Sequence, residues 1–263
     1  MSSLWSRILV AAVGLPVVLG VVWLGGWWLC IAAIVAGVVA LHELYAMARP
    51  LRPLALAGYT GLALTLLGAQ LGGPVWMVGG FLTTLAFAFL LKGVSDTRQS
   101  LTVAVAATVL GVAWVGLGLA YLMLLRGLPD HGRLAIFAVL LAVFGADTLA
   151  FFTGRLIGRH KLAPVISPGK TWEGLAASTV AAVLIPFFAL YHQHFLSVGE
   201  SLVLGVVIAV AAPVGDLFES AVKRDFGVKD SSRLLAGHGG VLDRLDAPLF
   251  AAVAAYYTIL AFT

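Results

Sequence analysis

The chain has 263 residues, of which 61% are hydrophobic and only 11% are charged. A soluble domain carries roughly 25% charged residues, because polar side chains must cover its surface. The composition therefore excludes an ordinary soluble domain and indicates an integral membrane protein. The net charge is +4, and no basic strand with interleaved aromatic residues favours binding to nucleic acid.

Nine apolar segments have about the length that a helix needs to cross the hydrocarbon core, roughly 17–25 residues. They lie near 8–24, 27–46, 54–71, 75–91, 101–125, 134–153, 174–196, 201–219 and 246–262. Lipid offers no partner to a free backbone amide, so we expect each segment to be helical. The sequence thus predicts an all-α, polytopic membrane protein with about nine transmembrane helices in a single membrane-embedded domain, 1–263.

The basic residues are distributed unevenly between the two sides of this predicted bundle. If the N-terminus is cytoplasmic, all of the 16 Lys and Arg residues except Arg126 and Arg133 fall on the cytoplasmic side. The positive-inside rule then predicts a cytoplasmic N-terminus and an external C-terminus. The connections 154–173 and 220–245 are expected to face the cytoplasm.

Acidic and basic residues gather near the end of the eighth segment. Asp216, Glu219 and Lys223 are spaced so that they share one face of a helix. Acidic residues at membrane depth normally face a wet cavity or a partner, and we expect Pro213 and Gly215 to loosen the helix there. An alternative for Glu219 is an internal ion pair with Lys223 at the helix end.

A glycine-rich loop and two further carboxylates follow. Gly237-His238-Gly239-Gly240 can present successive amides to an anion, although such glycines are also common in plain turns. Asp246 is a candidate metal ligand, with the alternative that it is only a helix N-cap. Together with basic neighbours, Asp216, Asp243 and Asp246 supply oxygen ligands for Mg²⁺ and cations for phosphate, which phosphoryl or nucleotidyl transfer requires.

A second polar block, 167–174, precedes the seventh segment. Its Gly-Lys-Thr sequence is not a P-loop, because Pro164 stands where that motif requires glycine. The alternative is a capped helix entrance, with Thr171 and Glu173 as ordinary first-turn residues. Asp147 lies within the sixth segment and is a functional candidate, whereas Glu43, near the end of the second, is expected only to reach toward the interface.

These residues match a known pattern over most of the C-terminal half. The matching positions are Ser220, Val222-Lys223-Arg224, Lys229-Asp230, Ser232, Leu235, His238-Gly239-Gly240-Val241 and Asp243-Arg244-Leu245-Asp246. This pattern resembles the signature of the phosphatidate cytidylyltransferases, or CDP-diacylglycerol synthases. The block 167–174 and Asp147-Thr148 with Gly154 resemble two further motifs of that family. Ala236 and Gly169 depart from the family pattern.

The resemblance implies Mg²⁺-dependent transfer of CMP from CTP to phosphatidate, giving CDP-diacylglycerol and pyrophosphate for phospholipid biosynthesis. We expect helices in 1–133 to provide support and lipid access, and 134–263 to carry the catalytic motifs. The predicted catalytic residues are Lys223, Arg224, His238, Asp243 and Asp246. The predicted substrate-binding residues are Ser167, Lys170, Thr171, Lys229, Gly239, Gly240 and Arg244. The predicted metal ligands are Asp216, Asp243, Asp246 and Asp147.

The predicted partners are CTP, phosphatidate in the inner leaflet, and membrane lipids, with no nucleic acid and with a homodimer possible. The expected location is a bacterial inner (cytoplasmic) membrane, with the active site facing the cytoplasm. Two alternatives are a membrane enzyme like the CDP-alcohol phosphotransferases, whose own motif is absent from the sequence, and a transporter with buried acidic residues.

Overall fold

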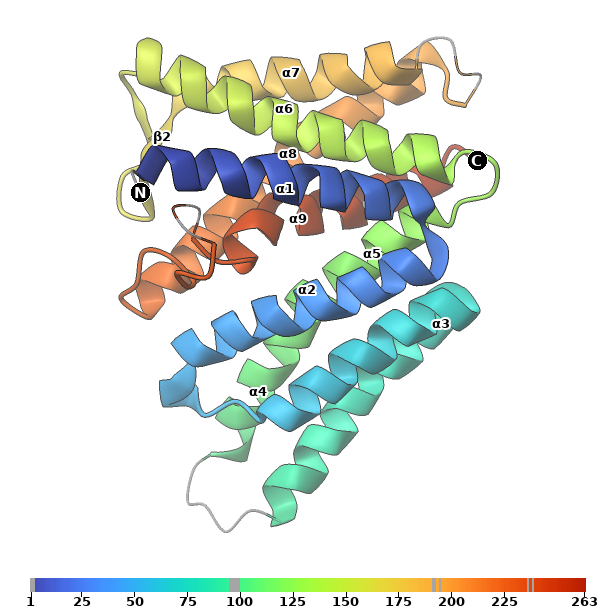
Figure 1. Ribbon diagram of the computed structural model, residues 1–263, viewed down its shortest axis with the longest axis vertical. Coiled ribbons are helices and arrows are strands. Elements are labelled where there is room, and N and C mark those ends of the chain that lie inside the picture. The colour runs from blue at the N-terminus through green and yellow to red at the C-terminus, as the bar shows by residue number, and fades with distance from the viewer. Residues whose placement is uncertain (1–2, 95–99, 191–192, 194, 236, 238) are drawn as a thin grey trace. The chain divides into compact units, whose positions relative to one another are not determined.

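The computed structural model describes residues 3–94, 100–190, 193, 195–235, 237 and 239–263, and the side chains from residue 12 onward. Helices make up all of its long elements (Figure 1). They are α1 (Ser3–Leu24), α2 (Gly26–Met47), η1 (Arg49–Leu51), α3 (Ala55–Val94), α4 (Leu101–Gly111), the π-helical turn η2 (Val112–Gly116), α5 (Leu117–Arg126), α6 (Gly132–Leu156), α7 (Trp172–Leu190), α8 (Val198–Asp225) and α9 (Leu242–Leu260). Two short antiparallel strands, β1 (Lys161–Ala163) and β2 (Ser167–Thr171), form one hairpin.

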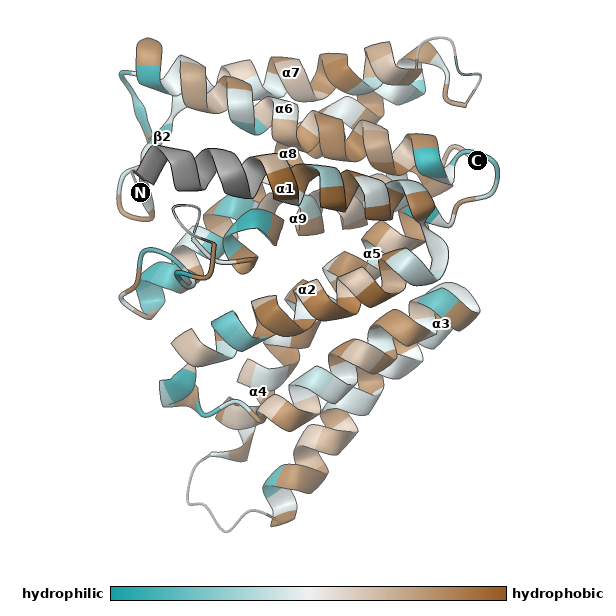
Figure 2. Ribbon diagram, in the orientation of Figure 1, coloured by the Kyte–Doolittle hydropathy of each residue, from teal (hydrophilic) through white to brown (hydrophobic). Residues whose placement is uncertain are grey.

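The predicted all-α membrane fold is confirmed by the length and composition of these helices. Within the described residues, six helical stretches are long and apolar enough to span a membrane, and Figure 2 shows apolar residues along most of their length. They are α2, α3, the stretch Leu101–Arg126, α6, α7 and α8. The count of nine spans stays a prediction.

Two predicted spans, 54–71 and 75–91, both lie within α3. The backbone leaves the helical conformation at Gly72 and Gly73, where the φ of Gly73 is 65° and therefore suits glycine. A β-carbon at Gly80 would collide with the backbone of Leu64. The two halves of α3 therefore run antiparallel in close contact, with the turn at Gly72 and Gly73, between the two predicted segments.

The chain forms two compact units. The first contains Met1–Gly127 and Phe226–Leu245, and the second contains Leu128–Asp225 and Asp246–Thr263. The boundary between the first and second units after Gly127 lies close to the expected division at 133/134. The segment Phe226–Leu245, however, belongs to the same unit as the N-terminal helices. The roles expected for the two halves stay predictions.

In the first unit, polar contacts join helices that are distant in sequence. The Arg126 guanidinium donates hydrogen bonds to the carbonyls of Val22 (2.9 Å) and Trp23 (3.0 Å), which satisfies carbonyls at the end of α1. The Tyr45 hydroxyl donates to the Thr108 carbonyl at 2.7 Å, joining α2 to α4. These contacts help to hold α2, whose C-terminal half carries Glu43.

In the second unit, small residues let helices approach closely. A β-carbon at Gly205 of α8 would meet the backbone of Val183 in α7, and one at Gly174 of α7 would meet the carbonyl of Ala150 in α6. The hairpin lies between α6 and α7 in the chain, and Thr171 ends β2 while its hydroxyl accepts a hydrogen bond from the Gly174 amide at 3.1 Å. Thr171 thus caps α7, as the alternative interpretation of this block expected.

Candidate functional site

Helix α8 carries the acidic residues of the second unit. It remains helical from Val198 to Asp225 through Pro213, so the expected loosening at Pro213 and Gly215 is wrong. Gly215 has a different use. A β-carbon there would collide with the carbonyl of Asp246 and the ring of Phe250, so its absence lets the backbone of α9 pack directly on α8.

This close approach brings three carboxylates together. Asp216 and Glu219 of α8 and Asp246 of α9 each have an oxygen within 4.8 Å of the others. Glu219 is buried, with 1% of its surface exposed, while Asp216 and Asp246 are half-buried. We call Asp216, Glu219 and Asp246 the acidic cluster.

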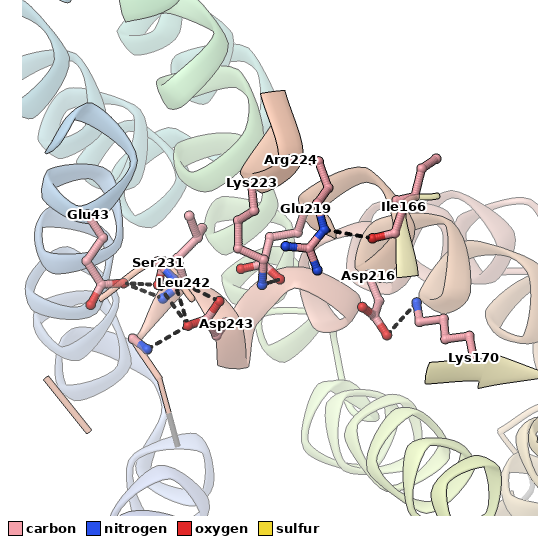
Figure 3. Close-up of polar contacts among 11 residues, drawn as sticks. Glu43, Ile166, Lys170, Asp216, Glu219, Lys223, Arg224, Ser231, Leu242 and Asp243 are labelled. Atoms are coloured by element: carbon pink, nitrogen blue, oxygen red, sulfur yellow. Dashed lines mark hydrogen bonds and ion pairs between the residues drawn. The ribbon is translucent and has the colours of Figure 1, made fainter. Parts of the chain in front are cut away.

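Two lysines pair with the acidic cluster. Lys170 Nζ of β2 lies 2.6 Å from Asp216 Oδ2, and Lys223 Nζ lies 3.0 Å from Glu219 Oε2 (Figure 3). Three carboxylates and two ammonium groups leave one net negative charge. Hard carboxylate oxygens with a residual negative charge fit a divalent cation such as Mg²⁺.

Arg224 connects the end of α8 to the hairpin. Its Nε donates a hydrogen bond to the carbonyl of Ile166 at 3.2 Å, directly before β2. Arg224 and Lys170 therefore sit on elements that are tied to one another within the second unit. Arg224 is exposed and accessible to a phosphate, whereas the Lys170 ammonium nitrogen is buried against Asp216 and only the rest of its side chain keeps exposed surface.

The first unit holds a second carboxylate arrangement, in the loop that precedes α9. Asp243 Oδ2 accepts hydrogen bonds from the Gly240 amide (2.7 Å) and from the Ser231 amide (3.1 Å), and it lies 3.0 Å from the Ser231 hydroxyl. Gly239 has a φ of 82° and Leu235 donates its amide to the Gly239 carbonyl at 2.9 Å. The loop is thus closed on itself by backbone and carboxylate contacts.

The other predicted site residues are distributed over both units. Asp147 lies on an exposed part of α6, and Ser167 and Thr171 lie at the two ends of β2. Lys229 and Arg244 are exposed. His238 lies outside the described residues, as does Ala236. The assignment of Asp243 and Asp147 as metal ligands stays a prediction.

Two acidic residues gain importance from the structure. Glu219 was expected as a candidate for a simple ion pair with Lys223, and that pair is present, yet Glu219 also belongs to the acidic cluster. Its i, i+3 spacing from Asp216 was the available signal. Glu43 was expected only to reach toward the interface, but it is buried, with 4% of its surface exposed.

The long apolar helices and, within the second unit, the acidic cluster with its two lysines define a class of protein: an integral membrane protein with a candidate site for a metal ion. The comparison with known families makes the class specific. The model of the "Cytidylyltransferase family" matches residues 5–262, and the chain belongs to that family.

Similar proteins extend over almost the full length. A phosphatidate cytidylyltransferase of Staphylococcus haemolyticus is 36% identical over 250 residues, covering 93% of this chain and 94% of the relative. One of Mycobacterium bovis is 33% identical and covers 94% of this chain and 85% of the relative. One of Haemophilus influenzae is 45% identical over 124 residues, which cover 45% of this chain. The resemblance found in the C-terminal motifs is thereby confirmed.

Proposed function

We propose that this protein transfers CMP from CTP to phosphatidate, giving CDP-diacylglycerol and pyrophosphate. A phosphate oxygen of phosphatidate attacks the α-phosphorus of CTP, and the bond from that phosphorus to the β-phosphate oxygen breaks. Phosphate monoesters have a second pKa of about 6, so the attacking oxygen is already anionic near neutral pH and needs no strong protein base. The requirement on the protein is to bring two anions together.

The observation that carries this proposal is the acidic cluster with its two lysines, in a chain of the cytidylyltransferase family. We assign Asp216, Glu219 and Asp246 as the residues that hold Mg²⁺. Held there, the ion would supply Lewis-acid stabilisation of the phosphate oxygens and of the pyrophosphate leaving group. Asp243 orders the loop, because Ser231 and Gly240 donate hydrogen bonds to its oxygens, and its assignment as a further metal ligand stays a prediction.

The basic residues then neutralise and orient the phosphates. Lys170 is held at 2.6 Å from Asp216, so an ammonium group lies beside the proposed metal site before substrate arrives. Lys223 is buried against Glu219 and keeps its charge directed at the cluster. Arg224 is exposed and provides a planar donor for a phosphate group. Fixed cations of this kind lower the barrier without reorganising during the reaction.

The remaining assignments complete the proposal. Ser167, Thr171, Lys229, Arg244 and the glycines at 239 and 240 bind substrate, and His238 orients a phosphate or acts as an acid. Phosphatidate enters from the cytoplasmic leaflet of a bacterial inner membrane. A homodimer stays a prediction.

Purified protein in lipid nanodiscs, with phosphatidate, MgCl₂ and each of the four NTPs in turn, tests this function. We expect pyrophosphate and a CDP-lipid to form when the nucleotide is CTP, and neither product to form with the other three NTPs. An enzyme like the CDP-alcohol phosphotransferases would instead consume CDP-lipid and leave CTP intact. A transporter would move solute across a vesicle membrane without CTP turnover. Either of these two results would reject the proposal.

A further inference from the structure

Glu43 of α2 is a buried carboxylate with four hydrogen-bond donors around it. Oε1 accepts from the Ser232 hydroxyl at 2.6 Å and from the Val241 amide at 3.0 Å. Oε2 accepts from the Ser231 hydroxyl at 3.0 Å and from the Leu242 amide at 2.8 Å. Each oxygen therefore has one hydroxyl donor and one backbone donor. Figure 3 shows the contacts of Glu43 with Ser231 and Leu242.

All four donors lie at the two ends of one loop, 231–242, almost two hundred positions along the chain from Glu43. Loop and helix belong to the same compact unit. A β-carbon at Gly240 would collide with the Glu43 carboxylate and with the Ser231 hydroxyl. Glycine at this position thus lets the loop backbone close around the Glu43 carboxylate.

Asp243 completes this arrangement from inside the loop. The Ser231 hydroxyl lies 3.0 Å from Glu43 Oε2 and 3.0 Å from Asp243 Oδ2. A hydroxyl has a single hydrogen, so it donates to one carboxylate at a time. The backbone amides of Val241 and Leu242 bond to Glu43 whichever carboxylate the Ser231 hydroxyl serves, so they tie the loop to α2.

We propose that Glu43 is a positioning residue that fixes the two ends of this loop, Ser231-Ser232 and Val241-Leu242, in the arrangement that binds CTP. The inference rests on the proposed function, since it takes the loop to contact the triphosphate. That Glu43 fixes the loop can be tested without the reaction. It assigns to the second N-terminal helix a defined task in substrate binding. A generic scaffold needs only apolar contacts, whereas this carboxylate matches a specific pair of hydroxyls and a specific pair of amides.

The substitution Glu43→Gln tests this match with almost no change in volume. In either orientation, the Gln amide group replaces an acceptor by a donor opposite one backbone amide, that of Val241 or of Leu242. The Ser hydroxyl on the same side is able to turn and accept, but a backbone N–H is not. One buried amide therefore loses its acceptor, and the native loop is disfavoured relative to open conformations.

We expect Glu43→Gln to change the KM for CTP much more than it changes kcat or the KM for phosphatidate. If the native loop becomes a minor conformation, the apparent affinity for CTP falls by its population. We expect Glu43→Gln to raise the KM for CTP roughly 10- to 100-fold, with kcat at saturating CTP and the KM for phosphatidate changed less than about threefold. This fold-change corresponds to about 1.4 to 2.8 kcal/mol.

Two further variants make the comparison sharper. Ser232→Ala removes one hydroxyl donor without disturbing the buried charge, and we expect it to raise the KM for CTP by about threefold to tenfold. Glu200→Gln is the matched control. Glu200 accepts a hydrogen bond from the Ser197 amide at 2.7 Å at the start of α8, where Gln serves equally well, so we expect wild-type constants.

Hydrogen exchange gives a readout that does not depend on activity. Peptides covering 231–242 are expected to exchange faster in Glu43→Gln than in wild type, while peptides from α8 are unchanged and the protein remains folded. A lower kcat with unchanged KM for CTP, or unchanged exchange in the loop, would overturn the inference. If wild-type protein fails to use CTP, the proposed function falls and the exchange data alone decide whether Glu43 fixes the loop.

Discussion

Substitution of Asp246 by Asn separates a metal site from a structural role. Asp246 has an oxygen within 4.8 Å of those of both Asp216 and Glu219. Two like charges at 4.8 Å repel by about 3.5 kcal/mol at an effective dielectric constant of about 20, and by about 0.9 kcal/mol in bulk water. Removing the charge of Asp246 relieves the repulsion with Asp216, and it weakens the hydrogen bond with Glu219 and the attraction to Lys223.

We therefore expect Asp246→Asn to be more stable than wild type without metal, by about 1–2 kcal/mol. Such a gain corresponds to a Tm higher by about 2–8 °C. Activity should change in the opposite direction, by a loss of at least about 100-fold, because one anionic ligand of the metal is gone. If Asp246 served only to stabilise the fold, Asp246→Asn would lower the Tm and leave the activity unchanged.

The assay combines thermal unfolding in nanodiscs, with and without MgCl₂, and product formation from CTP and phosphatidate. Wild type should gain Tm on addition of MgCl₂, since a ligand that binds only the folded state stabilises it, and Asp246→Asn should lose most of that gain. Asp225→Asn is the control, because Asp225 is exposed at the end of α8. A destabilised Asp246→Asn protein with full activity and an unchanged response to MgCl₂ would refute the metal assignment.

Three further predictions concern the cations, the chemistry and the topology. Lys170→Gln should raise the KM for CTP at least about tenfold, because it removes the ammonium group beside Asp216, whereas Lys161→Gln, at the exposed first position of β1, should match wild type in the same assay. CTP with a chiral α-phosphorothioate should react with inversion in a direct displacement, and retention in the product would indicate a covalent enzyme intermediate. Reporter fusions at Thr263 and within 154–173 should lie on opposite sides of the membrane, so the same side for both would contradict the predicted topology.

The sequence predicted the helical class because the apolar segments are long and nearly free of charge. It also separated the segments 54–71 and 75–91, and the turn of α3 lies between them, where Gly73 has a positive φ that suits glycine. Helix spacing identified the shared face of Asp216, Glu219 and Lys223. Each of these features is set by residues that are close together in the sequence, so the sequence alone is sufficient to predict it.

Other features depend on contacts between distant segments. Gly215 was expected to loosen α8, but it admits the α9 backbone instead, and this contact is what places Asp246 beside Asp216. Glu43 was expected to reach toward the interface because its partners in the loop 231–242 lie almost two hundred positions away, and the residues next to Glu43 do not indicate them. A buried acid inside an apolar segment was the available signal that it has a specific partner.

The most direct measurement of the proposed reaction follows the two ends of the CTP triphosphate. Purified protein in nanodiscs with phosphatidate and MgCl₂ is given CTP labelled at the α-phosphorus or at the γ-phosphorus, and the lipid is then extracted. Transfer of CMP predicts α-label in the lipid fraction and γ-label only in water-soluble pyrophosphate. Recovery of γ-label in the lipid, or of both labels in the aqueous phase with intact CTP, would contradict the account.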